Sequence, residues 1–192
     1  MITQPAVRGV DSELVSASWS DPEAFAELFD RYSAMLYRYV SKRLGPGPAE
    51  DLVGETFLIA FSKRRSYDLS YPDARPWLFG ILTKLVARHH RSEATRYRAL
   101  LRAPVEAEVE SPADRVAAGV SAQAVRGELA GALAALPAKD RDVLLLIAWG
   151  DLTYEEVARA LGIPVGTVRS RLNRGRRKVR AALGDINPME EE

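Results

Sequence analysis

Cysteine is absent from the 192-residue chain, and this absence excludes several classes of protein. Without cysteine the chain has no disulfide scaffold, no thiol nucleophile and no cysteine-ligated zinc. The chain also shows no basic start followed by an apolar run, and no apolar run approaches the ~20 residues that span a bilayer. These features predict a cytoplasmic protein that does not insert into a membrane.

Constellations suited to catalysis or metal binding are missing as well. The two histidines, His89 and His90, have no acidic partner at ligand spacing. The sequence shows no paired catalytic carboxylates, no nucleophile with its base and no phosphate-binding loop. We therefore predict no enzyme activity, no cofactor and no metal site.

Strand patterns and internal repeats are absent too, and the periodicity is helical throughout. One helix is predicted to begin at Asp21 and Pro22 and to end at Gly45. Further helices are predicted over 49–63 and from residue 73 or 74 onward. Apolar residues at spacings of three and four are expected to line one face of the first helix: Phe25, Leu28, Phe29, Tyr32, Leu36 and Val40.

Composition divides the chain into two helical parts. Residues 103–127 contain two prolines and a cluster of acids but no large apolar stripe, which is typical of a flexible linker. We predict an all-α fold of two small domains joined by this linker. The predicted segments are an N-terminal segment (1–19), a first domain (20–102), the linker (103–127), a second domain (128–184) and a tail (185–192).

The second domain carries the signals of a helix-turn-helix. Thr153 and Glu156 have capping-box spacing, which marks a helix start, and Gly162 fits the turn that ends this short helix. Pro164 suits the first turn of a longer helix. An apolar stripe on that longer helix predicts that one edge docks on the domain: Val165, Val168, Leu172, Val179 and Leu183.

Positive charge is concentrated on the remaining faces of the longer helix. Between Arg169 and Arg180 the chain has seven basic residues and no acidic one. DNA phosphates would neutralise this charge, and side chains in the first half of the helix would reach base edges. A solvated basic helix, or one that binds RNA or acidic lipid, is the alternative. The residues predicted to contact duplex DNA are Thr167, Arg169, Ser170, Arg171, Arg174, Arg177 and Lys178.

Two stretches together resemble a known family. "LPAKDRDVLLLIAWGDLTYEEVARALGIPVGTVRSRLNRGRRKVRAAL" is similar to region four of bacterial extracytoplasmic-function (ECF) sigma factors. "DPEAFAELFDRYSAMLYRYV", "AEDLVGETFLIAF" and "ARPWLFGILTKLVARHHR" resemble region two of the same family. A helix-turn-helix regulator that binds operators but not polymerase is the alternative, although its receiver domain would alternate strands and helices.

The resemblance implies a protein that binds core RNA polymerase, through its clamp coiled coil and its flap, and starts transcription at particular promoters. Region four would read the minus-thirty-five element as duplex, and region two would open the minus-ten element into single strands. The resemblance also implies control by an anti-sigma factor.

The helix predicted over 49–63 is apolar on several faces, so it is buried on more than one side or has a partner. Asp51, Glu55 and Leu58 lie on one flank. The resemblance implies that they bind the polymerase clamp. Core packing beside two solvated acids is the alternative.

The loop that follows combines cations with aromatic rings, as single-stranded DNA sites do. Its tyrosines could equally pack the loop against the domain, and Trp77 is predicted to be core. Cations farther along the chain are expected to face phosphates. The residues predicted to contact the minus-ten element are Lys63, Arg64, Arg65, Tyr67, Tyr71, Lys84, Arg88 and Arg91.

Overall fold

The computed structural model describes residues 10–100 and 128–183 of the chain. Below, these two ranges are the N-terminal and the C-terminal domain. All regular structure within them is helical, which confirms the predicted all-α class. The predicted linker (103–127) and tail (185–192) lie outside the described residues. No helix in the described ranges is long and apolar enough to cross a membrane.

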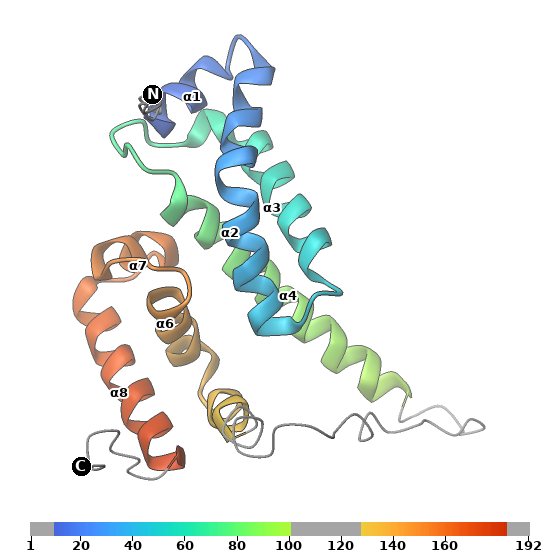
Figure 1. Cartoon of the computed structure of the whole chain (residues 1–192), viewed down its shortest axis with the longest axis vertical. Helices are drawn as coiled ribbons and strands as arrows, with labels where there is room; N and C mark the ends of the chain where they lie inside the picture. Colours follow the sequence, from blue (N-terminus) through green and yellow to red (C-terminus); the bar gives the residue numbers. More distant parts are fainter. Residues whose placement is uncertain (1–9, 101–127, 184–192) are drawn as a thin grey trace, which may run out of the picture.

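The N-terminal domain is a bundle built on α2 (Ala26–Leu44), α3 (Ala49–Lys63) and α4 (Arg75–Leu100) (Figure 1). A 3-10 turn (Pro22–Phe25) precedes α2, and the Asp21 carboxylate caps this turn by accepting from the Glu23 amide at 3.2 Å. The α2 helix ends at Gly45, whose φ of 86° favours glycine. The predicted start and stop signals are therefore used, although the first turn is 3-10 rather than α.

The predicted apolar face of α2 is correct except at Phe29. Leu28, Leu36 and Val40 are almost fully buried, whereas Phe29 keeps 44% of its surface exposed. Its ring instead packs edge-on against Phe57 of α3, with the ring centroids 4.9 Å apart. Phe29 therefore lies at the outer α2–α3 seam and not in the core.

A short helix, α1 (Asp11–Ala17), lies where the sequence suggests only an N-terminal segment. Asp11 is 2% exposed and accepts hydrogen bonds from the Tyr32 hydroxyl and from the Ala74 amide (2.7 Å), and it pairs with Arg31. Burial and the Asp11 hydrogen bond raise the pKa of Tyr32, so its hydroxyl stays a donor. This single carboxylate ties α1 to α2 and to the start of α4.

The C-terminal domain comprises a helical segment at residues 128–134 followed by α6 (Ala138–Ala148), α7 (Tyr154–Leu161) and α8 (Val165–Leu183). The capping box at the start of α7 is confirmed. Thr153 accepts from the Glu156 amide at 3.3 Å, and the Glu156 carboxylate accepts from the Thr153 amide at 2.8 Å. Gly162 ends α7 with a φ of 63°, as the turn requires.

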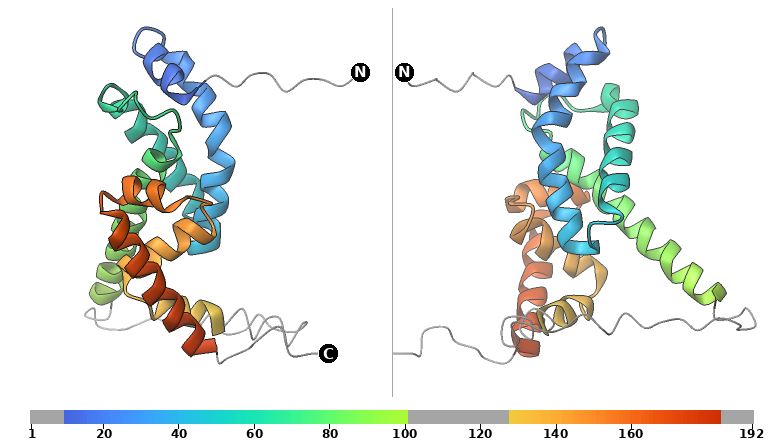
Figure 2. Two further views of the ribbon diagram at one scale, coloured as in Figure 1. Left: turned by 90° about the vertical axis from the view of Figure 1, so that its left-hand side faces the viewer. Right: turned by 45° about the vertical axis from the view of Figure 1, so that its right-hand side comes forward.

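The two domains contact each other through α4 and α7, which lie side by side (Figures 1 and 2). Gly80 of α4 approaches the α7 backbone so closely that a Cβ there would lie 2.5 Å from the Ala160 carbonyl oxygen. Arg75 donates to Glu156 across the contact at 3.1 Å, and Arg43 pairs with Asp142. We call this packing of α4 on α7 the closed arrangement.

Candidate nucleic-acid interface

The α8 helix docks by its predicted apolar stripe. Val168 and Leu172 are buried and the other stripe residues are half-buried. Gly175 is also buried, against α6, where a side chain there would meet the Asp140 carbonyl oxygen at 3.7 Å. Of the seven basic residues of the helix only Arg171 is half-buried, and the exposed ones leave a cationic face for an anionic partner.

The polar residues predicted on α8 differ in how freely they can move. Arg169, Arg177 and Lys178 are exposed, and Thr167 and Arg171 are half-buried. The Ser170 hydroxyl donates to the Thr167 carbonyl at 3.0 Å. Arg174 is held by the buried Asp140 of α6, with Nε 3.2 Å from the carboxylate. The first half of α8 therefore combines available cations with one arginine whose direction is fixed.

The basic start of the loop after α3 is partly committed to the fold. Arg64 donates to the carbonyls of Ser18 (3.1 Å) and Phe61 (2.8 Å), and its guanidinium stacks over the Phe61 ring at 3.9 Å. Arg65 donates to the Trp19 carbonyl at 3.5 Å, while Lys63 is exposed. Of the predicted cations here, Arg64 has the strongest structural role.

The two loop tyrosines, which the sequence cannot tell apart, have different environments. Tyr67 is 7% exposed, packs on Trp77 and donates its hydroxyl to the Tyr71 carbonyl at 2.7 Å. Burial raises the pKa of Tyr67, so this hydrogen bond persists across the neutral range. Tyr71 is 39% exposed. Tyr67 therefore packs the loop down, whereas Tyr71 offers a ring at the surface.

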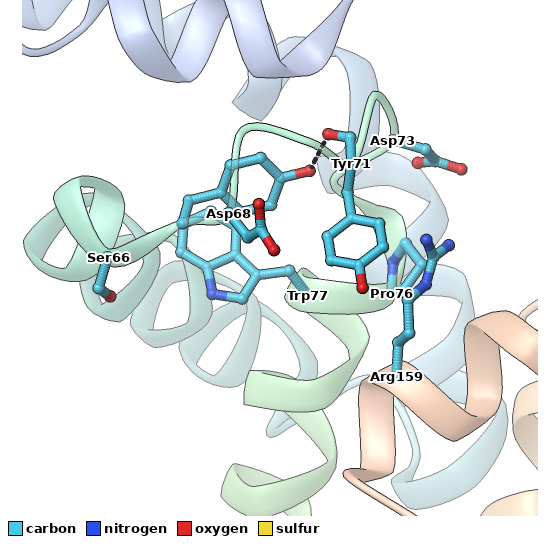
Figure 3. A pocket seen from close by; sticks show the side chains of 8 residues that line it. Ser66, Asp68, Tyr71, Asp73, Pro76, Trp77 and Arg159 are labelled. Carbon is cyan, nitrogen blue, oxygen red and sulfur yellow. Dashed lines mark hydrogen bonds between the residues drawn. The ribbon is translucent and has the colours of Figure 1, made fainter. Parts of the chain in front are cut away.

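A cavity of about 230 Å³ opens between these rings. Arg159 of α7 reaches into it from the C-terminal domain, with its guanidinium over the Tyr71 ring at 4.4 Å (Figure 3). Trp77, predicted as core, is half-buried in its wall. We call this cavity the loop cavity. Its lining residues are Ser66, Tyr67, Asp68, Tyr71, Asp73, Pro76, Trp77 and Arg159.

Farther along α4, Lys84, Arg88 and Arg91 are all exposed. Arg88 forms an ion pair with Glu55 of α3 at 2.5 Å, so a residue predicted to face DNA contacts one predicted to face polymerase. The Arg88 side chain is exposed and the Glu55 side chain is partly exposed, so solvent screens this pair and either group can take another partner.

The outer face of α2 and α3 is apolar and open. Leu58 is 69% exposed, Asp51 two turns earlier on α3 is exposed, and Phe29 of α2 adds further apolar surface. A hollow on this face is lined by Phe29, Ser33, Ala34, Tyr37, Arg38, Glu50, Val53 and Gly54. Large exposed apolar side chains clustered in this way mark a surface that a partner covers.

Comparisons with known proteins decide the identity of this arrangement. The family described as "Sigma-70 region 2" matches residues 28–96, and "Sigma-70, region 4" matches residues 126–179. The chain is 30% identical over 182 residues to the ECF RNA polymerase sigma factor SigK of Mycolicibacterium vanbaalenii, which covers 91% of this chain and 89% of the relative. The chain belongs to the ECF family of RNA polymerase sigma factors.

Another relative of this sigma factor is SigW of Bacillus subtilis, 31% identical over 179 residues, covering 86% of this chain and 92% of SigW. CnrH, solved in complex with the cytosolic domain of CnrY, has a TM-score of 0.61 at 26% identity and covers 91% of this chain and 97% of its own. RpoE of Bartonella quintana shares the fold, with a TM-score of 0.61 at 23% identity over 84% of this chain and 98% of its own.

A sigma factor binds core RNA polymerase and promoter DNA and directs the start of transcription, so these are the partners of this chain. An operator-binding regulator would have a receiver domain in the first half of the chain. Sigma region two matches there instead, so this alternative is excluded. The relatives are sigma factors and not enzymes. Within the described ranges no group of three or more metal-ligating side chains is placed to hold an ion.

From the sequence no role was predicted for Arg159 or Asp140, and Phe29 was predicted to lie in the core. Arg159 meets the loop only because the two domains touch, and no local pattern signals this contact. Phe29 recurs at the spacing of the core residues of α2, so the periodicity predicted that it is buried, although it is exposed. Asp140 looks like an ordinary first-turn acid of α6 until its pairing with Arg174 is seen.

Proposed function

We propose that three surfaces of the chain have three partners. The α8 helix reads the minus-thirty-five element in the major groove. The loop cavity and the α4 cations hold the melted minus-ten element, and the outer α2–α3 face binds the polymerase clamp coiled coil. Polymerase supplies the catalysis, and this chain supplies none. The proposal rests on one observation, that the chain has three distinct surfaces of different chemistry. They are a cationic helix face, an aromatic loop cavity and an open apolar face.

For the minus-thirty-five element, Arg171 is the proposed base reader. It sits in the first half of α8, half-buried and not held by a carboxylate among the described residues as Arg174 is. Arg171→Ala is expected to weaken binding to the preferred duplex by about 1–3 kcal/mol and to relax the preference at one base pair. Fluorescence anisotropy on a panel of singly substituted duplexes measures both effects.

The matched control is Arg180→Ala, at an exposed position near the end of the same helix. As a phosphate contact it should lower affinity for all duplexes about equally and reduce the salt dependence. If Arg171→Ala also weakens all sequences equally, Arg171 contacts phosphate and does not read a base.

For the minus-ten element, the exposed ring of Tyr71 is the proposed stacking surface for an unpaired base. In the closed arrangement the Arg159 guanidinium occupies that ring face. A base and Arg159 cannot lie over the same face together, so binding of the single strand requires the Arg159 side chain to leave the ring.

The spacing of the promoter elements requires a larger movement, a separation of the two domains. Their names place them about 25 base pairs apart, which is about 85 Å of duplex at 3.4 Å per base pair. Domains that touch through α4 and α7 do not reach across such a distance. We infer that the closed arrangement opens before the chain holds both elements.

Gly80→Ala is expected to open the chain. The added Cβ would lie 2.5 Å from a backbone oxygen of α7, while alanine stabilises the interior of α4 by about 1 kcal/mol relative to glycine. Spin labels on cysteines introduced at the exposed Ser62 and Ala182 would be the only thiols in the chain. We expect the distance between them to lengthen and broaden.

Gly131→Ala is the control, because a Cβ at Gly131 meets nothing within 4 Å in the described part of the chain. It should leave the distance distribution unchanged. An unchanged distribution in Gly80→Ala as well would mean that α4 and α7 do not pack in solution as described.

We further infer that a protein antagonist acts as an anti-sigma factor for this chain. The support is CnrH, a similar protein that was solved with the cytosolic domain of CnrY bound. The test is run-off transcription with the purified cytosolic domain of the protein encoded next to this chain. Loss of transcripts at a stoichiometric amount supports the inference, and undiminished transcripts count against that candidate.

A further inference from the structure

A second cavity, also of about 230 Å³, lies between the two domains and shares no lining residue with the loop cavity. We call it the seam cavity. Its basic lining comes from Lys42 and Arg43 of α2, His90 of α4 and Arg141 of α6, and the lining contains no carboxylate. Apolar side chains complete the wall: Ala130, Leu133, Ala134, Leu145 and Trp149.

Two guanidinium groups in this wall have unused donors. The Arg43 side chain is 5% exposed; its terminal nitrogens donate to Asp142 and to the Tyr39 hydroxyl (3.1 Å), but its Nε has no hydrogen-bond partner among the described residues. The buried Nε of Arg141 likewise has none. Neither guanidinium group therefore uses all of its donors on protein acceptors, and the charge of both lies in the wall of the cavity.

The charge around the cavity favours an anion over water. Four basic groups line the cavity, and Asp142, which pairs with Arg43, supplies a single negative charge next to them. Burial lowers the pKa of His90, and the positive charges of Arg43, Arg141 and His89 lower it further, against an opposing effect of Asp142. The lowering of this pKa by neighbouring positive charges indicates a positive electrostatic potential at the cavity. A bound anion would neutralise that potential.

We propose that the seam cavity binds a small tetrahedral dianion, either inorganic phosphate or the phosphate group of a small ester. Arg141, Lys42 and His90 would donate to its oxygens, and Arg43 would contribute positive charge from α2. Because the cations come from both domains, the anion holds the domains together. Its binding therefore stabilises the closed arrangement by linkage.

Sulfate is the first probe, because it is a tetrahedral dianion that does not titrate between pH 5.5 and 8. We expect calorimetry on the full chain, with sodium chloride matching the ionic strength, to show one site. Arg141→Gln should weaken binding at least about tenfold, as expected for a lost charged hydrogen bond. Lys139→Gln, an exposed lysine on the same helix and outside the cavity, should leave it unchanged.

Lys42→Gln provides a second variant at an exposed position, in case Arg141→Gln disturbs the fold. It should also weaken sulfate binding by several-fold. Equal sulfate affinity in the wild type and in both cavity variants, or no binding by the wild type at millimolar sulfate, overturns the proposal and leaves a water-filled cavity.

Binding should also take up a proton. The charged and titratable groups that face His90 are Arg43, Lys42, His89, Arg141 and Asp142, and a bound dianion would favour the protonated form of His90 against the positive charges that lower its pKa. Sulfate affinity should rise as pH falls from 8 to 5.5, by at most about tenfold per pH unit for one proton. His90→Asn should flatten this dependence, and an unchanged slope in His90→Asn would remove His90 from the site.

Inorganic phosphate and phenyl phosphate distinguish the two sources of the dianion. Tighter binding of phenyl phosphate means that Leu133, Leu145 and Trp149 contact the apolar part of an ester, and equal binding means that only the dianion is recognised.

In either case the distribution of distances between the labels at positions 62 and 182 should become narrower when the anion is added. Binding that leaves this distance unchanged would overturn the claim that the anion holds the domains together. These measurements use no polymerase or promoter, so they stand or fall separately from the proposed function.

Discussion

Leu58→Asp is expected to weaken binding to core RNA polymerase by about 2–4 kcal/mol, or about 30- to 1,000-fold. Leu58 is the most exposed large apolar side chain described, at 69%, and it projects from the middle of α3. Placing a carboxylate in the centre of a desolvated contact removes the apolar anchor and adds a charge without a partner. Titration of labelled chain with core polymerase measures the loss.

Leu129→Asp is the matched control for this change. Leu129 is also exposed, at 36%, but it lies in the C-terminal domain, far along the chain from α3. It should bind core polymerase like the wild type. Because Leu58 is exposed, both variants should keep the wild-type unfolding midpoint. Undiminished polymerase affinity in Leu58→Asp would remove the α2–α3 face from the polymerase contact.

Asp11→Ala is expected to lower the free energy of unfolding by about 3–5 kcal/mol. The substitution leaves the Ala74 amide without its acceptor and deprives Tyr32 and Arg31 of a buried partner. Arg31 keeps its i,i+4 pair with Glu27, so the loss should fall toward the lower end of that range. Urea denaturation followed by circular dichroism measures it.

Glu13→Ala tests whether the loss belongs to the buried carboxylate. Glu13 is an exposed acid in the same short helix, and surface changes of this kind alter stability by about 0.5 kcal/mol or less. Asp11→Asn, which keeps the shape but not the charge, should be intermediate. If Asp11→Ala unfolds at the same urea concentration as Glu13→Ala, the buried Asp11 carboxylate contributes nothing to the stability of the N-terminal domain.

Local signals in the sequence were enough to predict most helices. The predicted 49–63 helix is observed as Ala49–Lys63, because its boundaries depend on nearby proline, glycine and charge. The capping box at Thr153 and the turn at Gly162 were predicted for the same reason, since each involves residues within one helical turn. The stripe of α8 follows from helical geometry alone.

Contacts between distant segments could not be predicted in this way. Asp11 accepts from Ala74, 63 residues away, and no periodicity links these positions. The same holds for Arg159 over Tyr71 and for Gly80 against Ala160, which depend on how two domains meet. The candidate site was therefore predicted as separate surfaces, while the closed arrangement that covers the loop cavity emerged only from the structure.

Transcription with purified components tests the central claim most directly. Core RNA polymerase and this chain are incubated with a genomic fragment library, and the 5′ ends of the transcripts are sequenced. We predict discrete start sites that share elements at minus thirty-five and minus ten, appear only when the chain is present and disappear with Leu58→Asp. Start sites identical to those of core polymerase alone would contradict the account.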